Sequence, residues 1–113
     1  MKIVTEKIKL SELQEMAAVM FGNMVKAVVD IKKEIMVVDA ELHSDEEALL
    51  IKEGSKQEDI WGINIYPELL ADERIEFDSM INLRPRLSNR TRGIDDPQIR
   101  SRIISIVKRL IEE

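Results

Sequence analysis

The chain has 113 residues with a formal net charge of −5, 44% hydrophobic and 35% charged residues, and no cysteine. These totals predict one soluble globular domain over residues 1–113 and exclude disulfides, thiolate metal sites and cysteine nucleophiles. No apolar run is long enough to cross a membrane and the charged N-terminus is no signal sequence, so we predict a cytoplasmic protein without a membrane partner. The Lys, Arg, Glu and Ile content is typical of thermophile proteins.

The first predicted elements are a short edge strand and a helix. Residues 2–6 alternate loosely between apolar and polar side chains, which predicts the strand. Ser11 and Gln14 have capping-box spacing, in which each side chain bonds to the other residue's backbone amide. Apolar residues at helical spacing follow, and Gly22 can take the left-handed conformation that ends a helix. We therefore predict a helix over residues 12–21.

The stretch from residue 25 to 53 predicts a long β-hairpin at the centre of the sheet. Apolar and polar residues alternate there with a period of two, and β-branched residues dominate. We predict the turn of this hairpin at Asp39-Ala40. An alternative stays open, because Ser44 also begins a capping-box pattern and Gly54 could end a short helix.

The second half of the chain predicts two more strands and a last helix. Alternating patterns cover residues 60–66 and 74–83, with a loop at residues 67–73 between them. Asp96-Pro97 then has the signature of a helix start, an N-cap followed by proline at the first helical position. The apolar stripe of that helix comprises Ile99, Ile103, Ile106, Val107 and Leu110.

These elements predict an α+β fold of two layers. Two amphipathic helices, one N-terminal and one C-terminal, would cover one face of an antiparallel sheet of four or five strands. The other face would stay open and would carry the polar side chains of the strands, which are Asp30, Lys32, Glu34, Glu41, His43, Asp45, Glu47, Asn64, Glu76, Asp78 and Asn82.

The open face offers one candidate site. On a strand, Glu41, His43, Asp45 and Glu47 would project together with Asp30 nearby, so these five residues are candidate catalytic residues of a metal-dependent hydrolase or nuclease. Carboxylates and one imidazole suit a hard or borderline divalent ion, with Glu41, His43 and Asp45 as candidate ligands. The simpler interpretation is a solvated or subunit-buried polar face, since His43 is the only histidine and many metalloenzymes use a pair.

A second candidate site is the arginine-rich segment before the last helix. Arg84, Arg86, Arg90 and Arg92 could bind a phosphate or carboxylate, because guanidinium groups hold such anions with two hydrogen bonds. The structural alternative pairs them with residues 39–78, which carry thirteen acidic and three basic side chains. If the arginines bind a partner instead, that partner would be an anionic small molecule, an acidic protein or a second copy of the chain. The acidic net charge and the few aromatic residues argue against a nucleic-acid partner.

Two stretches carry a family resemblance. FGNMVKAVVDIKKEIMVVDAELHSDEEALLIKEGSKQEDIWGINIYP and FDSMINLRPRLSNRTRG resemble a family of small prokaryotic proteins of unknown function. The resemblance extends from about residue 21 to the last helix and implies a compact stand-alone cytosolic protein, without implying an activity, a cofactor or site residues. We favour a non-enzymatic binding or interaction module that contacts an anion or acidic partner through the arginine loop. The alternative is the metal-dependent hydrolase.

Overall fold

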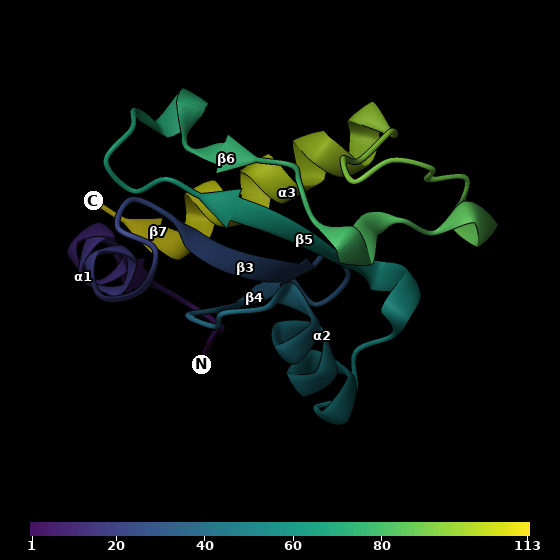
Figure 1. The fold of residues 1–113 in the computed structure, drawn as a ribbon, viewed down its shortest axis with the longest axis horizontal. Coiled ribbons are helices and arrows are strands. Elements are labelled where there is room, and N and C mark those ends of the chain that lie inside the picture. The colour runs from purple at the N-terminus through teal and green to yellow at the C-terminus, as the bar shows by residue number, and fades with distance from the viewer.

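Five antiparallel strands form the central sheet in a computed structural model that describes residues 1–113 (Figure 1). Their order across the sheet is β1-β4-β3-β5-β6. The strands are β1 (Lys2–Val4), β3 (Val25–Asp30), β4 (Ile35–Val38), β5 (Ile60–Ile65) and β6 (Ile75–Glu76). All six residues of β5 are buried, so the central strands are covered on both faces. The antiparallel sheet, its five strands and the α+β class confirm the prediction.

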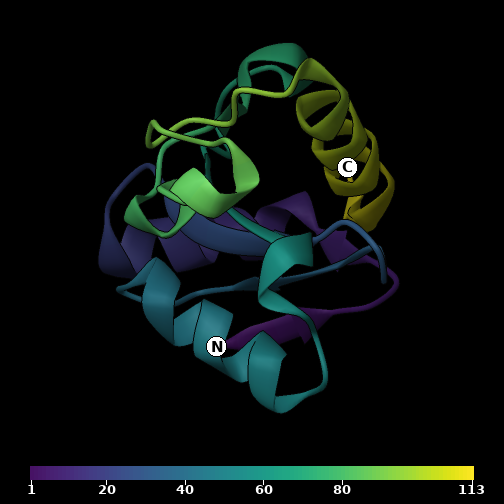
Figure 2. The ribbon, with the colours of Figure 1, turned by 90° about the vertical axis from the view of Figure 1, so that its right-hand side faces the viewer.

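Three α-helices cover the two faces of the sheet, and they are α1 (Leu10–Met20), α2 (His43–Lys52) and α3 (Pro97–Leu110). Leu13 of α1 and Ile103 of α3 share one apolar core with Val29 of β3 and Ile63 of β5. Leu50 of α2 packs on the opposite face in a smaller core. Figure 2 shows α2 and α3 on opposite sides of the sheet. The prediction of two layers with an open polar face is wrong, because α2 covers that face. None of these helices is long and apolar enough to cross a membrane.

The hairpin of β3 and β4 turns seven residues earlier than predicted, over residues 31–34, which pairs Val28 with Val37. The side chain of Asp30 begins this turn, since its Oδ1 accepts the amide hydrogens of Lys32 and Lys33 at 2.9 Å each. Glu34 completes the turn with a φ of 59°. The predicted turn at Asp39-Ala40 is wrong. No glycine, proline or asparagine interrupts the alternating pattern at residues 31–34, so the sequence did not mark this turn.

Residues 43–52 form the helix that was the alternative to a strand, and Gly54, whose φ is 102°, follows two residues after its end. His43, Glu46 and Leu50 are the buried residues of α2 and share the side that faces the sheet. Leu50 contacts the core formed by Val28 and the neighbouring strands. Leu50 is thus buried on the sheet side of the helix and Leu49 is half-buried. Of the acidic residues of α2, Asp45 is exposed, Glu47 is half-buried and Glu46 is buried.

The first and last helices lie close to the predicted positions. Helix α1 ends where predicted, with the amide of Gly22 donating to the carbonyl of Ala17 at 2.6 Å, but Ser11 lies inside the helix and caps nothing. Helix α3 begins as predicted, with the Asp96 side chain accepting from the amide of Gln98 at 2.8 Å. Two short parallel strands, β2 (Ile8–Lys9) and β7 (Ile111–Glu112), join the start of α1 to the end of α3.

The predicted strand over residues 74–83 is mostly absent. Only β6 pairs with β5, and the chain then forms the 3₁₀ turns η3 (Met80–Asn82) and η4 (Pro85–Leu87); two further turns are η1 (Gln57–Asp59) and η2 (Ala71–Glu73). The side chain of Asn82 bonds to both the amide and the carbonyl of Gly62, at 2.8 and 2.9 Å. The Asn82 side chain takes the backbone hydrogen bonds at the edge of β5 that a neighbouring strand would otherwise make. The alternating pattern beyond residue 76 therefore does not pair with β5.

Candidate functional site

The residues predicted to form a metal or hydrolytic site do not come together. Asp30 is buried and accepts the hydroxyl of Ser55 at 2.6 Å, whereas Glu41 and Asp45 are exposed. Glu47 pairs with an arginine at 3.0 Å. No three His, Asp or Glu side chains are grouped so that they could hold a metal ion. Their predicted common face required a strand at residues 41–47, and most of this segment is helix.

Of the four predicted anion-binding arginines, Arg84 is part of the core. Its guanidinium donates to the carbonyls of Gln57 and Ile60 at 2.8 and 2.6 Å and to the carboxylate of Glu47 at 3.0 Å. It also lies 5.1 Å from the ring centre of Trp61. Burial lowers the pKa of Arg84, and the neighbouring Glu47 opposes that shift. These contacts join η1, α2 and β5, so Arg84 has a structural role.

The other three arginines point to different places. Arg86 lines a shallow groove of about 550 Å³ beside Lys56, and Arg90 is exposed. Arg92 donates from Nε to Oδ1 of Asp78 at 2.7 Å and faces a separate cleft. The predicted cluster of four arginines is therefore not formed. Arg84 and Arg86 line one groove, and Arg92 lines a separate cleft with other polar groups.

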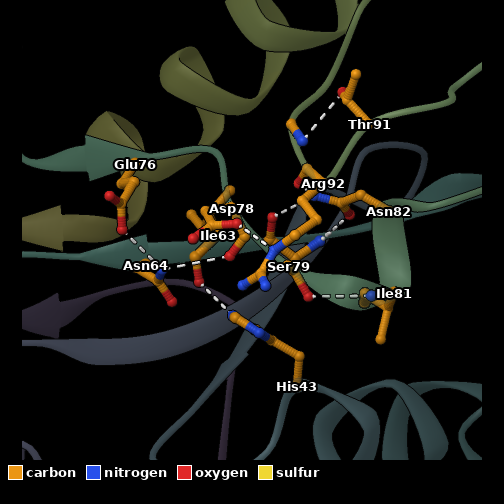
Figure 3. Close-up of polar contacts among 12 residues, drawn as sticks. His43, Ile63, Asn64, Glu76, Asp78, Ser79, Ile81, Asn82, Thr91 and Arg92 are labelled. Carbon is orange, nitrogen blue, oxygen red and sulfur yellow. Dashed lines mark hydrogen bonds and ion pairs between the residues drawn. The ribbon is translucent and has the colours of Figure 1, made fainter.

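This cleft, of about 180 Å³, lies between the start of α2, the strands β3 and β5, and residues 78–92 (Figure 3). We call it the α2 cleft. Its polar lining consists of Lys26, His43, Ser44, Asn64, Ser79 and Arg92, together with Asp78. The volume is several times the ~30 Å³ that one water molecule occupies in the liquid and is below the range of about 300–1,000 Å³ for drug-sized ligands. It suits a small molecule or a small group of a larger one.

His43 is the first residue of α2 and lies at the base of the α2 cleft. Its Nε2 lies 2.7 Å from the carbonyl oxygen of Ile63. Since a carbonyl only accepts, Nε2 carries the proton and Nδ1 has the free lone pair. Burial lowers the pKa of His43 below its usual 6.5, so the ring is neutral at neutral pH. Nδ1 makes no hydrogen bond within the chain and is not enclosed.

Asn64 and Arg92 contribute further unused hydrogen-bonding atoms. The Asn64 amide group donates to Oε1 of Glu76 at 2.9 Å and to the carbonyl of Asp78 at 3.3 Å, and its buried Oδ1 has no partner. Arg92 uses Nε for Asp78, and Figure 3 shows its terminal nitrogens directed toward the His43 side of the cleft. These terminal nitrogens have no partner in the chain, so they can donate to a bound anion.

Helix α2 adds a positive end to the cleft. No side chain caps its N-terminus, so the amides of His43 and Ser44 lack intrahelical acceptors. The helix dipole places partial positive charge at the same point. Glu46, one turn further on, is fully buried, and burial raises the pKa of its carboxyl to about 10. Glu46 is therefore uncharged at neutral pH and does not repel an anion at the helix start.

Two apolar side chains form the rim of the cleft. Leu42 and Met80 both line it and are 54% and 63% exposed. They lie on opposite segments, one before α2 and one in η3. A polar base with an apolar rim fits a ligand whose charged group enters first.

Sequence reasoning singled out His43 and Arg92 but placed them in two different sites. It counted Asn64 only as one of many polar residues and missed Lys26, Ser44 and Ser79 as neighbours of His43. The Ser44 capping pattern was the one available signal, because a helix starting there places His43 at its N-terminus. Nothing in the spacing connects this helix start to residues 78–92.

The fold and the α2 cleft define a small α+β protein with a three-layer core and one compact polar cleft. The family model DUF5674, described as a protein of unknown function, matches residues 2–110, and the chain belongs to this family. The resemblance to a family of unknown function is thereby confirmed. No curated protein and no solved structure matches the chain.

Proposed function

We propose that this protein binds a small oxyanion-bearing molecule in the α2 cleft. The observation that carries the proposal is the convergence of Arg92 and the uncapped start of α2 on one cleft, where the terminal nitrogens of Arg92 have no partner in the chain. Positive groups and free amides at a helix start bind phosphate and carboxylate groups. The prediction of an anion-binding module thus moves from the whole arginine loop to this cleft.

A free hydrogen-bond acceptor in the cleft restricts the chemical class of the ligand further. Nδ1 of the neutral His43 is an acceptor that has no donor within the chain and is not enclosed, so a ligand that supplies a donor can bond to it. We infer a ligand that combines an oxyanion with hydroxyl or amino groups, as hydroxy acids and sugar phosphates do.

Two other functions were predicted from the sequence, a metal-dependent hydrolase and a module that binds an acidic protein or a second copy of the chain. The metal-dependent hydrolase requires Asp30, Glu41, Asp45 and Glu47 around His43, and these side chains are dispersed. An acidic protein partner or a second copy of the chain stays a prediction. The exposed Arg86 and Arg90 remain available to such a partner.

The test is a titration of the full chain with inorganic phosphate, followed by nitrogen–proton NMR of the backbone amides. We expect the amides of His43 and Ser44 to shift in a saturable manner. Arg92→Gln should weaken binding about ten- to hundredfold, because a hydrogen bond to a charged group contributes about 1.5–3 kcal/mol. Arg86→Gln removes the same charge outside the cleft and should bind like the wild type.

Three outcomes would contradict the proposal. The first is that phosphate and simple hydroxy acids shift no amide of the cleft at any concentration. The second is that Arg86→Gln weakens binding as much as Arg92→Gln, which would indicate a diffuse effect of net charge. The third is that the shifts map to Lys56 and Arg86, which would place the anion in the groove that these two residues line.

A further inference from the structure

His43 combines three properties that together define a nucleophile. Its tautomer is set by the 2.7 Å contact between Nε2 and the Ile63 carbonyl, which leaves the Nδ1 lone pair free. His43 is only 8% exposed, yet it lines the α2 cleft, and Nδ1 is not among the enclosed atoms of the chain. It stands at the first position of an uncapped ten-residue helix. A side chain held in this way cannot turn its free nitrogen elsewhere without losing the bond to Ile63.

The surroundings of Nδ1 suit a phosphoryl group. The uncapped amides of α2 and the terminal nitrogens of Arg92 can hold the oxygens of a phosphoryl group next to the ring. Lys26 also lines the cleft, but its ammonium lies over the ring of Phe21. Electrostatic stabilisation of this kind is the main contribution of proteins to phosphoryl transfer.

The cleft lacks a group that could protonate a poor leaving group. Asp78 accepts from Arg92 at 2.7 Å, and the Lys26 ammonium lies 5.2 Å from the ring centre of Phe21, turned toward the end of α1. The proton on His43 Nε2 is donated to Ile63. An alkyl phosphate, whose alkoxide must be protonated as it leaves, is therefore a poor donor here. A donor whose leaving group is stable as an anion needs no such acid.

We propose that His43 accepts a phosphoryl group on Nδ1 from an acyl phosphate or a comparable activated phosphoryl donor. The Nδ1 lone pair forms the N–P bond while the bond between phosphorus and the acyl oxygen breaks, and the carboxylate leaves with that electron pair. No proton moves, because Nε2 keeps its hydrogen on the Ile63 carbonyl. The positive charge that the ring acquires is balanced by the phosphoryl oxygens and stabilised by this carbonyl. The inference rests on the proposed function, since it uses the same cleft.

The test uses the full chain with acetyl phosphate and, separately, with phosphoramidate, which cannot acetylate lysines. Intact mass and phosphorus NMR follow the gain of one phosphoryl group. A phosphoryl group that is labile in acid and stable in base lies on a nitrogen, and since His43 is the only histidine, its loss in His43→Gln assigns it to His43. We expect the folded chain to react at least about tenfold faster than the same chain unfolded in urea, because the cleft positions both reactants.

The variants separate the cleft from a general effect. His43→Gln should abolish the acid-labile product, and Arg92→Gln should slow its formation about a hundredfold, as loss of one stabilising donor does in other enzymes. Lys52→Gln removes one charge at the far end of α2 and should react like the wild type. If His43→Gln does not fold, the inference is still tested by two measurements. These are the reaction rate of Arg92→Gln and the ratio of the rates for the folded and the unfolded chain.

Equal rates for folded and unfolded chain would overturn the inference. So would an acid-stable product, which indicates a serine or threonine. Phosphate binding without any phosphoryl transfer would refute the role of His43 and leave the proposed function intact. A chain that neither binds phosphate nor accepts a phosphoryl group would refute both this inference and the proposed function.

Discussion

The buried glutamate of α2 makes a quantitative prediction about stability. Glu46 has no exposed surface, neither carboxylate oxygen has a hydrogen-bond partner, and burial raises its pKa from 4.5 to about 10. The amino groups of Lys26 and of the chain N-terminus oppose this shift but do not cancel it. The folded chain therefore keeps Glu46 protonated at neutral pH, whereas the unfolded chain ionises it.

The sign of the effect follows from proton binding. Above pH 4.5 the unfolded state binds fewer protons at Glu46 than the folded state, so the free energy of unfolding falls as the pH rises. Each pH unit between the two pKa values contributes about 1.4 kcal/mol, which amounts to about 3 kcal/mol at pH 7. The contribution of Glu46 to stability is thus fully present below pH 4.5 and is lost progressively up to about pH 10.

Glu46→Gln removes this ionisation and keeps the shape of the side chain. We expect the variant to gain stability over the wild type as the pH rises from 4.5 to 7, reaching about 3 kcal/mol more than their difference in acid. Any cost of placing an amide in this site is independent of pH and cancels in the comparison. Urea denaturation at several pH values, followed by the fluorescence of the single Trp61, measures the difference.

The matched control is Glu68→Gln, which removes a carboxylate from an exposed loop. Its difference from the wild type should show no such rise between pH 4.5 and 7. Parallel pH profiles for wild type and Glu46→Gln would refute the reasoning, because they would mean that Glu46 is ionised in the folded state and solvated or paired there.

Further predictions concern the two structural contacts that sequence reasoning did not foresee. Arg84→Gln should lower the free energy of unfolding by about 3–5 kcal/mol, since it leaves the half-buried Glu47 without its partner. Phosphate binding should persist in this variant. Unchanged stability together with lost phosphate binding would contradict the structural role of Arg84. Gly62→Ala would place a Cβ 2.5 Å from the Ser79 hydroxyl and should cost about 1–3 kcal/mol in urea denaturation. Ser79→Gly in the same chain should recover part of that loss, and no recovery would mean that the strain lies elsewhere.

The helices at the two ends were predictable because their signals are local. A helix start such as Asp96-Pro97 and an end such as Gly22 depend on a few neighbouring residues, and an apolar stripe shows which side must be buried. The alternation in residues 60–66 predicts β5, which covers Ile60–Ile65, in the same way. Only the Ser11 cap failed, and the helix formed around it without the side-chain bond.

The middle of the chain was not predictable, since two local patterns competed there. Residues 43–52 contain acidic residues at both strand and helix spacing, and burial of Leu50 against Val28 and Val37 selects the helix. The early turn after Asp30 depends on one carboxylate that accepts two amides, which no composition rule marks. Together these two features bring α2 onto the face that was predicted to be open.

By itself the sequence determined the α+β class, the antiparallel sheet and the positions of the first and last helices, because periodicity and capping act over a few residues. Only the tertiary structure decided which arginine is buried and which is free. Arg84 meets the carbonyls of Gln57 and Ile60, whereas Arg92 reaches the α2 cleft beside His43. The physical reason is that such contacts join segments far apart in the chain, and their partners exist only once the layers have packed.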